Sequence, residues 1–260
     1  MPPAVGRLAT VRLATATAAC AALIGATAGP AQADPLALEA TAALYSFQVG
    51  DRTESLVVES GRPGDHNEFR QSEHASGRTT AHPGWDIRLS DDATAPAWDY
   101  AIGIAGSNHD GDGVSGSSSW GTLSLVDEDP SGLPFAVIQA EGGVTCDSKT
   151  GEIWSGNPNP TRFQVRRGGQ LVDVTPNSGP LTLDDVTPGD RTGGSPARTT
   201  VSIVTVSDVD QLTGHQPFAK YADRARTAAR GHALVIRQQP DPAQPPTTYR
   251  LLTNTTAASC

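Results

Sequence analysis

Residues 44–59 read LYSFQVGDRTESLVVE, and this stretch sets the pattern that decides the fold. Apolar and polar residues alternate across residues 44–49, as in a β-strand with one buried face. Gly50-Asp51 then offers a turn, and a second β-type run follows at residues 55–59. The stretch therefore predicts an antiparallel β-hairpin.

Short runs of the same kind recur along most of the chain, divided by Gly, Pro, Asn, Asp and Ser. We expect further strands at residues 85–89, 98–105, 120–126, 135–140, 163–165, 171–174, 199–206, 234–236 and 248–256. Many short strands separated by turn residues are typical of a sandwich or barrel rather than of βαβ units. The sequence therefore predicts an all-β or mainly-β fold, antiparallel and sandwich-like.

One segment has helical character. Apolar residues recur at helical spacing from Phe218 to Ala225, Pro217 suits a first helical position, and Gly231 suits a stop. We therefore expect one short helix near residues 217–230. The polar stretches 61–83 and 184–196 are each expected to be a long surface loop or an extension of uncertain order.

The N-terminus has the features of an export signal. Arg7 and Arg12 form a basic start, residues 13–28 are small and apolar, and Ala31-Gln32-Ala33 is a small-x-small cleavage site. This predicts a secretory signal peptide at residues 1–33 and a mature protein that is secreted, extracellular or associated with the cell wall. No later run approaches the roughly 18 apolar residues that span a bilayer, so we expect no membrane span.

Residues 34–260 are long enough for one large mainly-β extracellular domain. A subdivision near residues 127–132 is the alternative. The abundance of Ala, Gly, Pro, Thr and Arg is similar to that of actinobacterial exported proteins.

The charge balance bears on partners. The chain carries 19 Lys and Arg against 28 Asp and Glu, a net charge of −9. Loss of residues 1–33 removes two arginines and gives 17 − 28 = −11. Nucleic-acid binding needs clustered cations, whereas the adjacent basic pair here is Arg166-Arg167. We expect neither nucleic acid nor an anionic membrane surface as a partner.

Cys146 and Cys260 are the cysteines that remain after the signal, since Cys20 lies inside it. Outside the cell, an isolated pair favours a disulfide. The bridge would close a loop of more than 100 residues and contribute ~4–5 kcal/mol by restricting the unfolded chain. A reactive thiol, or a lipidated Cys20, is the alternative.

A calcium loop is suggested by Asn108, Asp110 and Asp112, followed by Gly113. This N-x-D-x-D-G spacing lets oxygen ligands converge, but the position of the usual bidentate Glu holds Ser119, so an EF-hand is not expected. Acids at residues 127–129 would complete such a site, and a solvated turn is the alternative. No cofactor is expected, with calcium as the possible exception.

Histidines also recur at intervals of eight, at His66, His74 and His82, with acids nearby that could help to hold zinc. A polar surface loop explains the same residues.

Aromatic residues suggest a second kind of site. Trp85, Trp98, Trp120 and Trp154 would usually anchor a core, and Trp98 and Trp120 are the candidates for stacking on sugar rings.

Catalytic signatures are mostly missing. The sequence has no G-x-S-x-G, no H-E-x-x-H and no phosphate-binding Gly loop. Carboxylates at residues 91–92 and 127–129 could serve a glycosidase, which needs two facing acids, but the sequence favours solvated loop acids. No catalytic residue is assigned, and the balance favours a protein that is not an enzyme.

From residue 135 onward the layout resembles a known family. A strand leads into Val144-Thr145-Cys146, a hairpin covers residues 163–174, a strand covers 199–206, and the chain ends in Ala257-Ala258-Ser259-Cys260. This order is similar to actinobacterial secreted surface proteins of the choice-of-anchor type, and it implies an extracellular β-rich domain with two cysteines. The function expected is binding or a structural role in the envelope, with a cell-wall glycan or another envelope component as partner. A secreted hydrolase of cell-wall or polysaccharide substrates, with acids from residues 110–129, and a secreted inhibitor are the alternatives.

Overall fold

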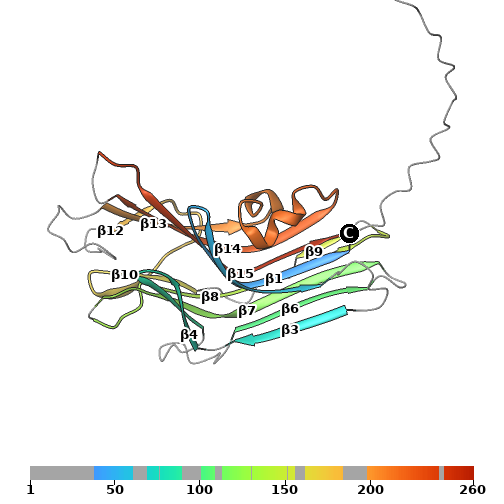
Figure 1. The fold of residues 1–260 in the computed structure, drawn as a ribbon, viewed down its shortest axis with the longest axis horizontal. Helices are drawn as coiled ribbons and strands as arrows, with labels where there is room; N and C mark the ends of the chain where they lie inside the picture. The colour runs from blue at the N-terminus through green and yellow to red at the C-terminus, as the bar shows by residue number, and fades with distance from the viewer. Residues whose placement is uncertain are drawn as a thin grey trace, which may run out of the picture. The chain divides into compact units, whose positions relative to one another are not determined.

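The protein is a sandwich of two antiparallel β-sheets, as the sequence predicts (Figure 1). This computed structural model describes residues 38–60, 69–75, 77–89, 101–108, 113–129, 131–150, 152–155, 162–183, 198–239 and 243–260. Residues 35–260 form one compact unit.

The first sheet has six strands in the order β12-β13-β14-β15-β1-β2. Their bounds are β1 (Glu39–Val49), β2 (Arg52–Ser60), β12 (Leu181–Leu183), β13 (Arg198–Val206), β14 (Thr227–Gln239) and β15 (Thr247–Ser259). The expected hairpin is confirmed, because β1 pairs with β2 through a turn at residues 50–51.

The second sheet has nine strands, six of them in the order β11-β10-β8-β7-β5-β4. In addition, β6 pairs with β7 and β3, and β9 pairs with β8. Their bounds are β3 (Phe69–Ala75), β4 (Gly77–His82), β5 (Trp85–Leu89), β6 (Ala101–Asn108), β7 (Val114–Val126), β8 (Ala136–Asp147), β9 (Ile153–Ser155), β10 (Arg162–Arg167) and β11 (Gln170–Asp173).

The core lies between the sheets, where the apolar positions of each alternating pattern meet. Both sheets supply side chains that are almost fully buried: Leu44, Phe47, Ile87, Leu123, Leu125, Ile138, Leu234, Ile236 and Leu251. The alternation seen in the sequence thus selects the face that is buried.

Serines rather than apolar residues join the sheets along the first half of β7. Ser115 Oγ donates to the Ser259 carbonyl at 2.6 Å, and Ser119 Oγ donates to Asn254 Oδ1 at 3.1 Å. Gly142 of β8 permits the close approach, because a Cβ there would meet the carbonyl oxygen of Asn254. Short polar side chains therefore replace a thick apolar layer in this region.

The expected helix near residues 217–230 is wrong in extent. The structure has two short 3₁₀ helices, η1 (Val209–Gln211) and η2 (Gln216–Tyr221), and β14 already begins at Thr227. The short helices lie over the outer face of the six-stranded sheet (Figure 1). Phe218 and Tyr221 of η2 belong to one buried cluster with Leu252 of β15, which explains their helical spacing. The residues that follow pair with β15 instead, and this non-local pairing overrides the local pattern.

Residues 61–83 are not one long loop, since they include β3 and β4. β7 is also longer than expected and begins at Val114. The segment around residues 127–132 links β7 to β8, and these two strands pair with each other along most of their length.

The expected disulfide between Cys146 and Cys260 is confirmed, with Cα atoms 5.6 Å apart. It ties β8 of one sheet to the end of β15 in the other. Among the described residues, no helix is long and apolar enough to cross a membrane.

Candidate functional site

A pocket of about 320 Å³ lies between the end of the β1–β2 hairpin and the turn that joins β4 to β5. Its volume falls at the small end of the range of about 300–1,000 Å³ that is usual for small-molecule sites. Apolar and polar residues share the lining: Phe47, Val49, Arg52, Thr53, Glu54, Ala81, His82 and Pro83.

The pairing of β1 with β2 turns two charged side chains toward this pocket. Glu54 lies opposite Phe47, and Arg52 lies opposite Val49. Directly opposed residues point to the same face of a sheet, so Arg52 and Glu54 face inward with Phe47. Because β2 is an edge strand, both charged residues remain exposed to solvent.

An aromatic cluster supports the pocket from behind. The ring of Tyr249 on β15 lies 6.1 Å from Phe47, 6.0 Å from His82 in an edge-on contact, and 5.6 Å from Trp85. Trp85 in turn meets Phe135 edge-on at 5.0 Å. Burial raises the pKa of Tyr249, and a hydrogen bond from Trp85 opposes that shift, so Tyr249 stays protonated as part of the apolar support.

Tyr45 fixes the two sides of the pocket to each other. It lies on β1 and hydrogen-bonds with the side chain of Thr79 on β4. Burial is the main cause that raises the pKa of Tyr45, and the nearby negative charge of Glu54 adds to it. The hairpin and β4 are thus held together by a neutral hydroxyl pair next to Glu54.

The pocket offers an apolar floor and a polar rim. Phe47 is almost fully buried at its base, whereas Arg52 and Glu54 supply a cationic donor and an anionic acceptor. Among the residues described as lining it, Glu54 is the one carboxylate, and hydrolysis of a glycosidic bond usually needs two. The arrangement therefore suits binding of a small polar ligand that has one apolar face.

The expected calcium loop falls largely outside the described residues, which exclude Asp110 and Asp112. Asn108 ends β6, next to the start of β7. Residues 127–129 follow the other end of β7, whose 13 residues extend roughly 40 Å. The expectation that these acids complete a site at Asn108 is therefore wrong.

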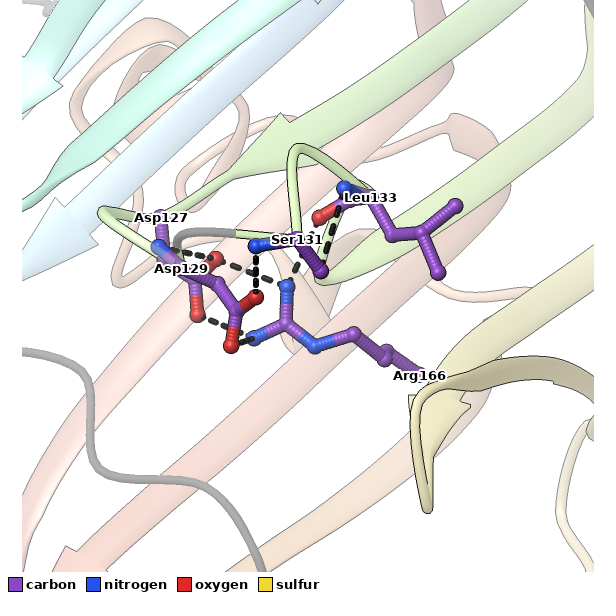
Figure 2. A network of polar contacts seen from close by, with 5 residues as sticks. All are labelled: Asp127, Asp129, Ser131, Leu133 and Arg166. Atoms are coloured by element: carbon purple, nitrogen blue, oxygen red, sulfur yellow. Dashed lines mark hydrogen bonds and ion pairs between the residues drawn. The ribbon is translucent and has the colours of Figure 1, made fainter.

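The acids at residues 127–129 have a structural partner instead. Asp127 accepts two hydrogen bonds from Arg166, at 2.9 and 2.6 Å, and Asp129 lies 3.3 Å from the same guanidinium (Figure 2). Arg166 also donates to the carbonyl of Leu133 at 2.7 Å. Within the described ranges, no group of three or more His, Cys, Asp or Glu side chains is placed to hold a metal ion.

The tryptophans that the sequence singles out lie in different environments. Trp98 lies outside the described residues, and Trp85 is buried in the core. Trp120 is half-buried on β7. Its neighbour Ser119 points across the sandwich to Asn254, so alternation places Trp120 on the outer face of the nine-stranded sheet. Stacking of sugars on Trp120 stays a prediction.

Of the three evenly spaced histidines, His82 lines the pocket, His74 lies in β3, and His66 is outside the described residues. The sequence did not single out Arg52 and Glu54. Their positions could have indicated a site, because Arg52 and Glu54 occupy inward-facing positions of β2, where apolar residues are expected.

Comparison with known proteins identifies no relative. No protein-family model matches the chain, and no curated protein or solved structure shows a significant match.

Proposed function

We propose that this is a secreted envelope-binding protein whose pocket takes one sugar unit of a cell-wall glycan. The observation that carries the proposal is the combination of an apolar floor with a rim of opposite charges in one pocket at the end of the β1–β2 hairpin. Secretion rests on the expected signal peptide.

A neutral sugar has the chemistry that this lining complements. Its ring presents C–H groups on one face and hydroxyl groups around its edge, and each hydroxyl both donates and accepts. Arg52 can donate to such hydroxyl groups, and Glu54 can accept from them. Hydrogen bonds to charged side chains are stronger than neutral ones, and the two opposite charges leave the rim without a net preference for an ion.

The pocket is also held in place before any ligand arrives. Gln48 Nε2 donates to the Gly50 carbonyl in the hairpin turn at 3.2 Å and to the Gly214 carbonyl at 3.1 Å. Tyr45 and Thr79 fix the opposite wall. Preformed walls reduce the ordering cost of binding, which favours a weak polar ligand such as a sugar.

The test is retention of the purified protein on insoluble peptidoglycan, followed by assay for released fragments. We expect retention without release, and about tenfold weaker retention for Arg52→Gln or Glu54→Gln, which corresponds to about 1.4 kcal/mol for a hydrogen bond to a charged group. Glu152→Gln, an exposed acid next to β9, is the matched control and should bind as the wild type.

Equal retention of Arg52→Gln, Glu54→Gln and Glu152→Gln would refute the pocket as the site. In that case the inward charges would serve only to blunt the edge strand against pairing with another chain. Release of fragments would instead support the hydrolase.

A further inference from the structure

The outer face of the six-stranded sheet carries three exposed arginines on three neighbouring strands. Arg198 lies on β13, Arg237 on β14 and Arg250 on β15. The adjacent residues Ile236 and Leu251 are fully buried in the core, so alternation turns Arg237 and Arg250 away from it. We refer to Arg198, Arg237 and Arg250 as the arginine row.

Strand register places the arginine row on a regular diagonal. Arg198 lies opposite Gln239, two residues from Arg237, and Arg250 lies opposite Val235, two residues from Arg237 on the other side. Each step is therefore one strand across and two residues along. With strands ~4.8 Å apart and ~3.4 Å per residue, each step is ~8 Å, and the row spans ~17 Å.

Among the residues that the structure describes, the arginine row has no anionic partner. In the described part of the chain, the arginines that form ion pairs are Arg166 and Arg224, not these three. The residues beside the row on the same face are uncharged, namely Thr200, Ser202, Val235, Gln239 and Thr248. Glu59, an acid farther along this sheet, is bound to Lys220 at 2.8 Å.

On the side of η2, Arg250 lies close enough to a histidine to affect its pKa. The neighbouring histidine is His215, which is almost fully buried. Burial lowers the pKa of His215 to about 4, and the charge of Arg250 adds to that effect. Three cations that form no ion pair with another described residue thus lie on one face of a chain whose net charge is −9.

We propose that the arginine row binds an acidic polysaccharide that runs diagonally over β13, β14 and β15. Arginine forms paired hydrogen bonds with carboxylates, and three such groups at even steps fit a polymer whose carboxylates recur along its length. Thr200, Ser202 and Thr248 place hydroxyl groups between the cations, where sugar hydroxyls would lie.

Charge density favours such a polymer over DNA. Duplex DNA carries one charge per ~1.7 Å and requires many clustered cations, whereas here three are spread over ~17 Å. The net negative charge of the rest of the chain would also repel a dense polyanion.

The arginine row is separate from the pocket at the end of the β1–β2 hairpin. Tyr249, behind the pocket, and Arg250 are consecutive residues of β15 that point to opposite faces of the sheet. The proposal therefore does not depend on the function proposed for the pocket.

The test compares two soluble polymers that share one backbone, carboxymethyl cellulose and hydroxyethyl cellulose, by affinity electrophoresis of the purified protein at low salt. We expect binding of the first and not of the second. Each single change, Arg198→Gln, Arg237→Gln or Arg250→Gln, should weaken binding about threefold, and the triple variant about thirtyfold, as for exposed ion pairs. Salt at 0.5 M should abolish binding.

Arg167→Gln, an exposed arginine at the end of β10 in the other sheet, is the control and should bind as the wild type. An Arg52→Gln variant should also bind the acidic polymer normally, which separates this surface from the pocket. Equal binding of both celluloses, unchanged binding by the triple variant, or tighter binding of duplex DNA than of carboxymethyl cellulose would each overturn the proposal.

Discussion

Replacing Asp127 with Asn tests whether the acids after β7 serve the fold or a reaction. Asp127 and Arg166 form a bidentate ion pair with side chains only 3% and 5% exposed. The pair fastens the β7–β8 turn to β10 (Figure 2). In Asp127→Asn the guanidinium keeps its charge but loses its main counter-charge, with the Leu133 carbonyl and the more distant Asp129 left as partners.

The expected loss follows from those remaining contacts. Removing one partner of a buried ion pair typically costs about 3–5 kcal/mol, because a buried charge is left uncompensated. Asp129 lies 3.3 Å from the guanidinium and restores part of the compensation. We therefore expect a loss near the lower limit, about 3 kcal/mol in the free energy of unfolding. The double variant Asp127→Leu/Arg166→Met removes both charges and should lose less than the single variant.

Urea unfolding followed by tryptophan fluorescence measures these differences. Glu128→Gln is the matched control, since this exposed acid lies next to Asp127 and should change stability by less than about 0.5 kcal/mol. A shift for Asp127→Asn no larger than that of Glu128→Gln would refute the structural role. Loss of fragment release from peptidoglycan in a variant of unchanged stability would assign Asp127 to catalysis instead.

Three further results are expected. Gly142→Ala should lower the free energy of unfolding by about 1–3 kcal/mol, because its Cβ would meet the carbonyl oxygen of Asn254. Gly143→Ala is the control and should be nearly neutral, because its Cβ finds no atom closer than 3.6 Å. Equal urea midpoints for the two variants would contradict the close approach of the sheets. Burial lowers the pKa of both His215 and His232 to about 4, so below pH 6.5 the unfolded chain binds protons that the folded chain does not. Stability should fall as pH drops from about 6.5 to about 4, by roughly 2–3 kcal/mol per histidine. Wild-type urea midpoints that are the same at pH 7 and pH 4.5 would count against this. So would a His215→Gln variant whose midpoint falls as much as that of the wild type. Reduction of the disulfide, which joins residues 114 apart in sequence, should lower the free energy of unfolding by ~5 kcal/mol if the bridge restricts the unfolded chain. Calorimetry with and without reductant measures the change in melting temperature. An unchanged melting temperature would contradict this prediction.

The parts of the fold that sequence could predict are those that are specified locally. The hairpin of β1 and β2 combines alternation with a Gly-Asp turn, and both signals lie within sixteen residues. The first half of β7 offers no such signal, because Ser and Gly dominate it. It is a strand because β6 and β8 pair with it and because its serines bond to β15. Of these partners, β6 directly precedes β7, whereas the paired part of β8 is farther along the chain and β15 belongs to the other sheet.

Both proposed surfaces depend on strand register, which explains why sequence did not reveal them. The arginine row joins Arg198, Arg237 and Arg250 across three strands, and only the register of these strands places the three residues on one diagonal. In the pocket, Glu54 and Arg52 can be recognised as inward-facing only from the β1–β2 register, which places them opposite Phe47 and Val49. The sequence also predicts a glycan partner, through tryptophans rather than through these residues, and that partner stays a prediction.

The two ends of the sandwich differ in a way that suits binding. At one end of β1, Glu39 pairs with Ser259 beside the disulfide, and the serines of β7 hold the sheets together. At the other end, Val49 pairs with Tyr249, and there the pocket lies on the inner face of the sheet and Arg250 on the outer face. The covalent link restricts the first end and leaves both surfaces of the second accessible. A glycan strand could therefore engage either surface without disturbing the contacts that hold the two sheets together.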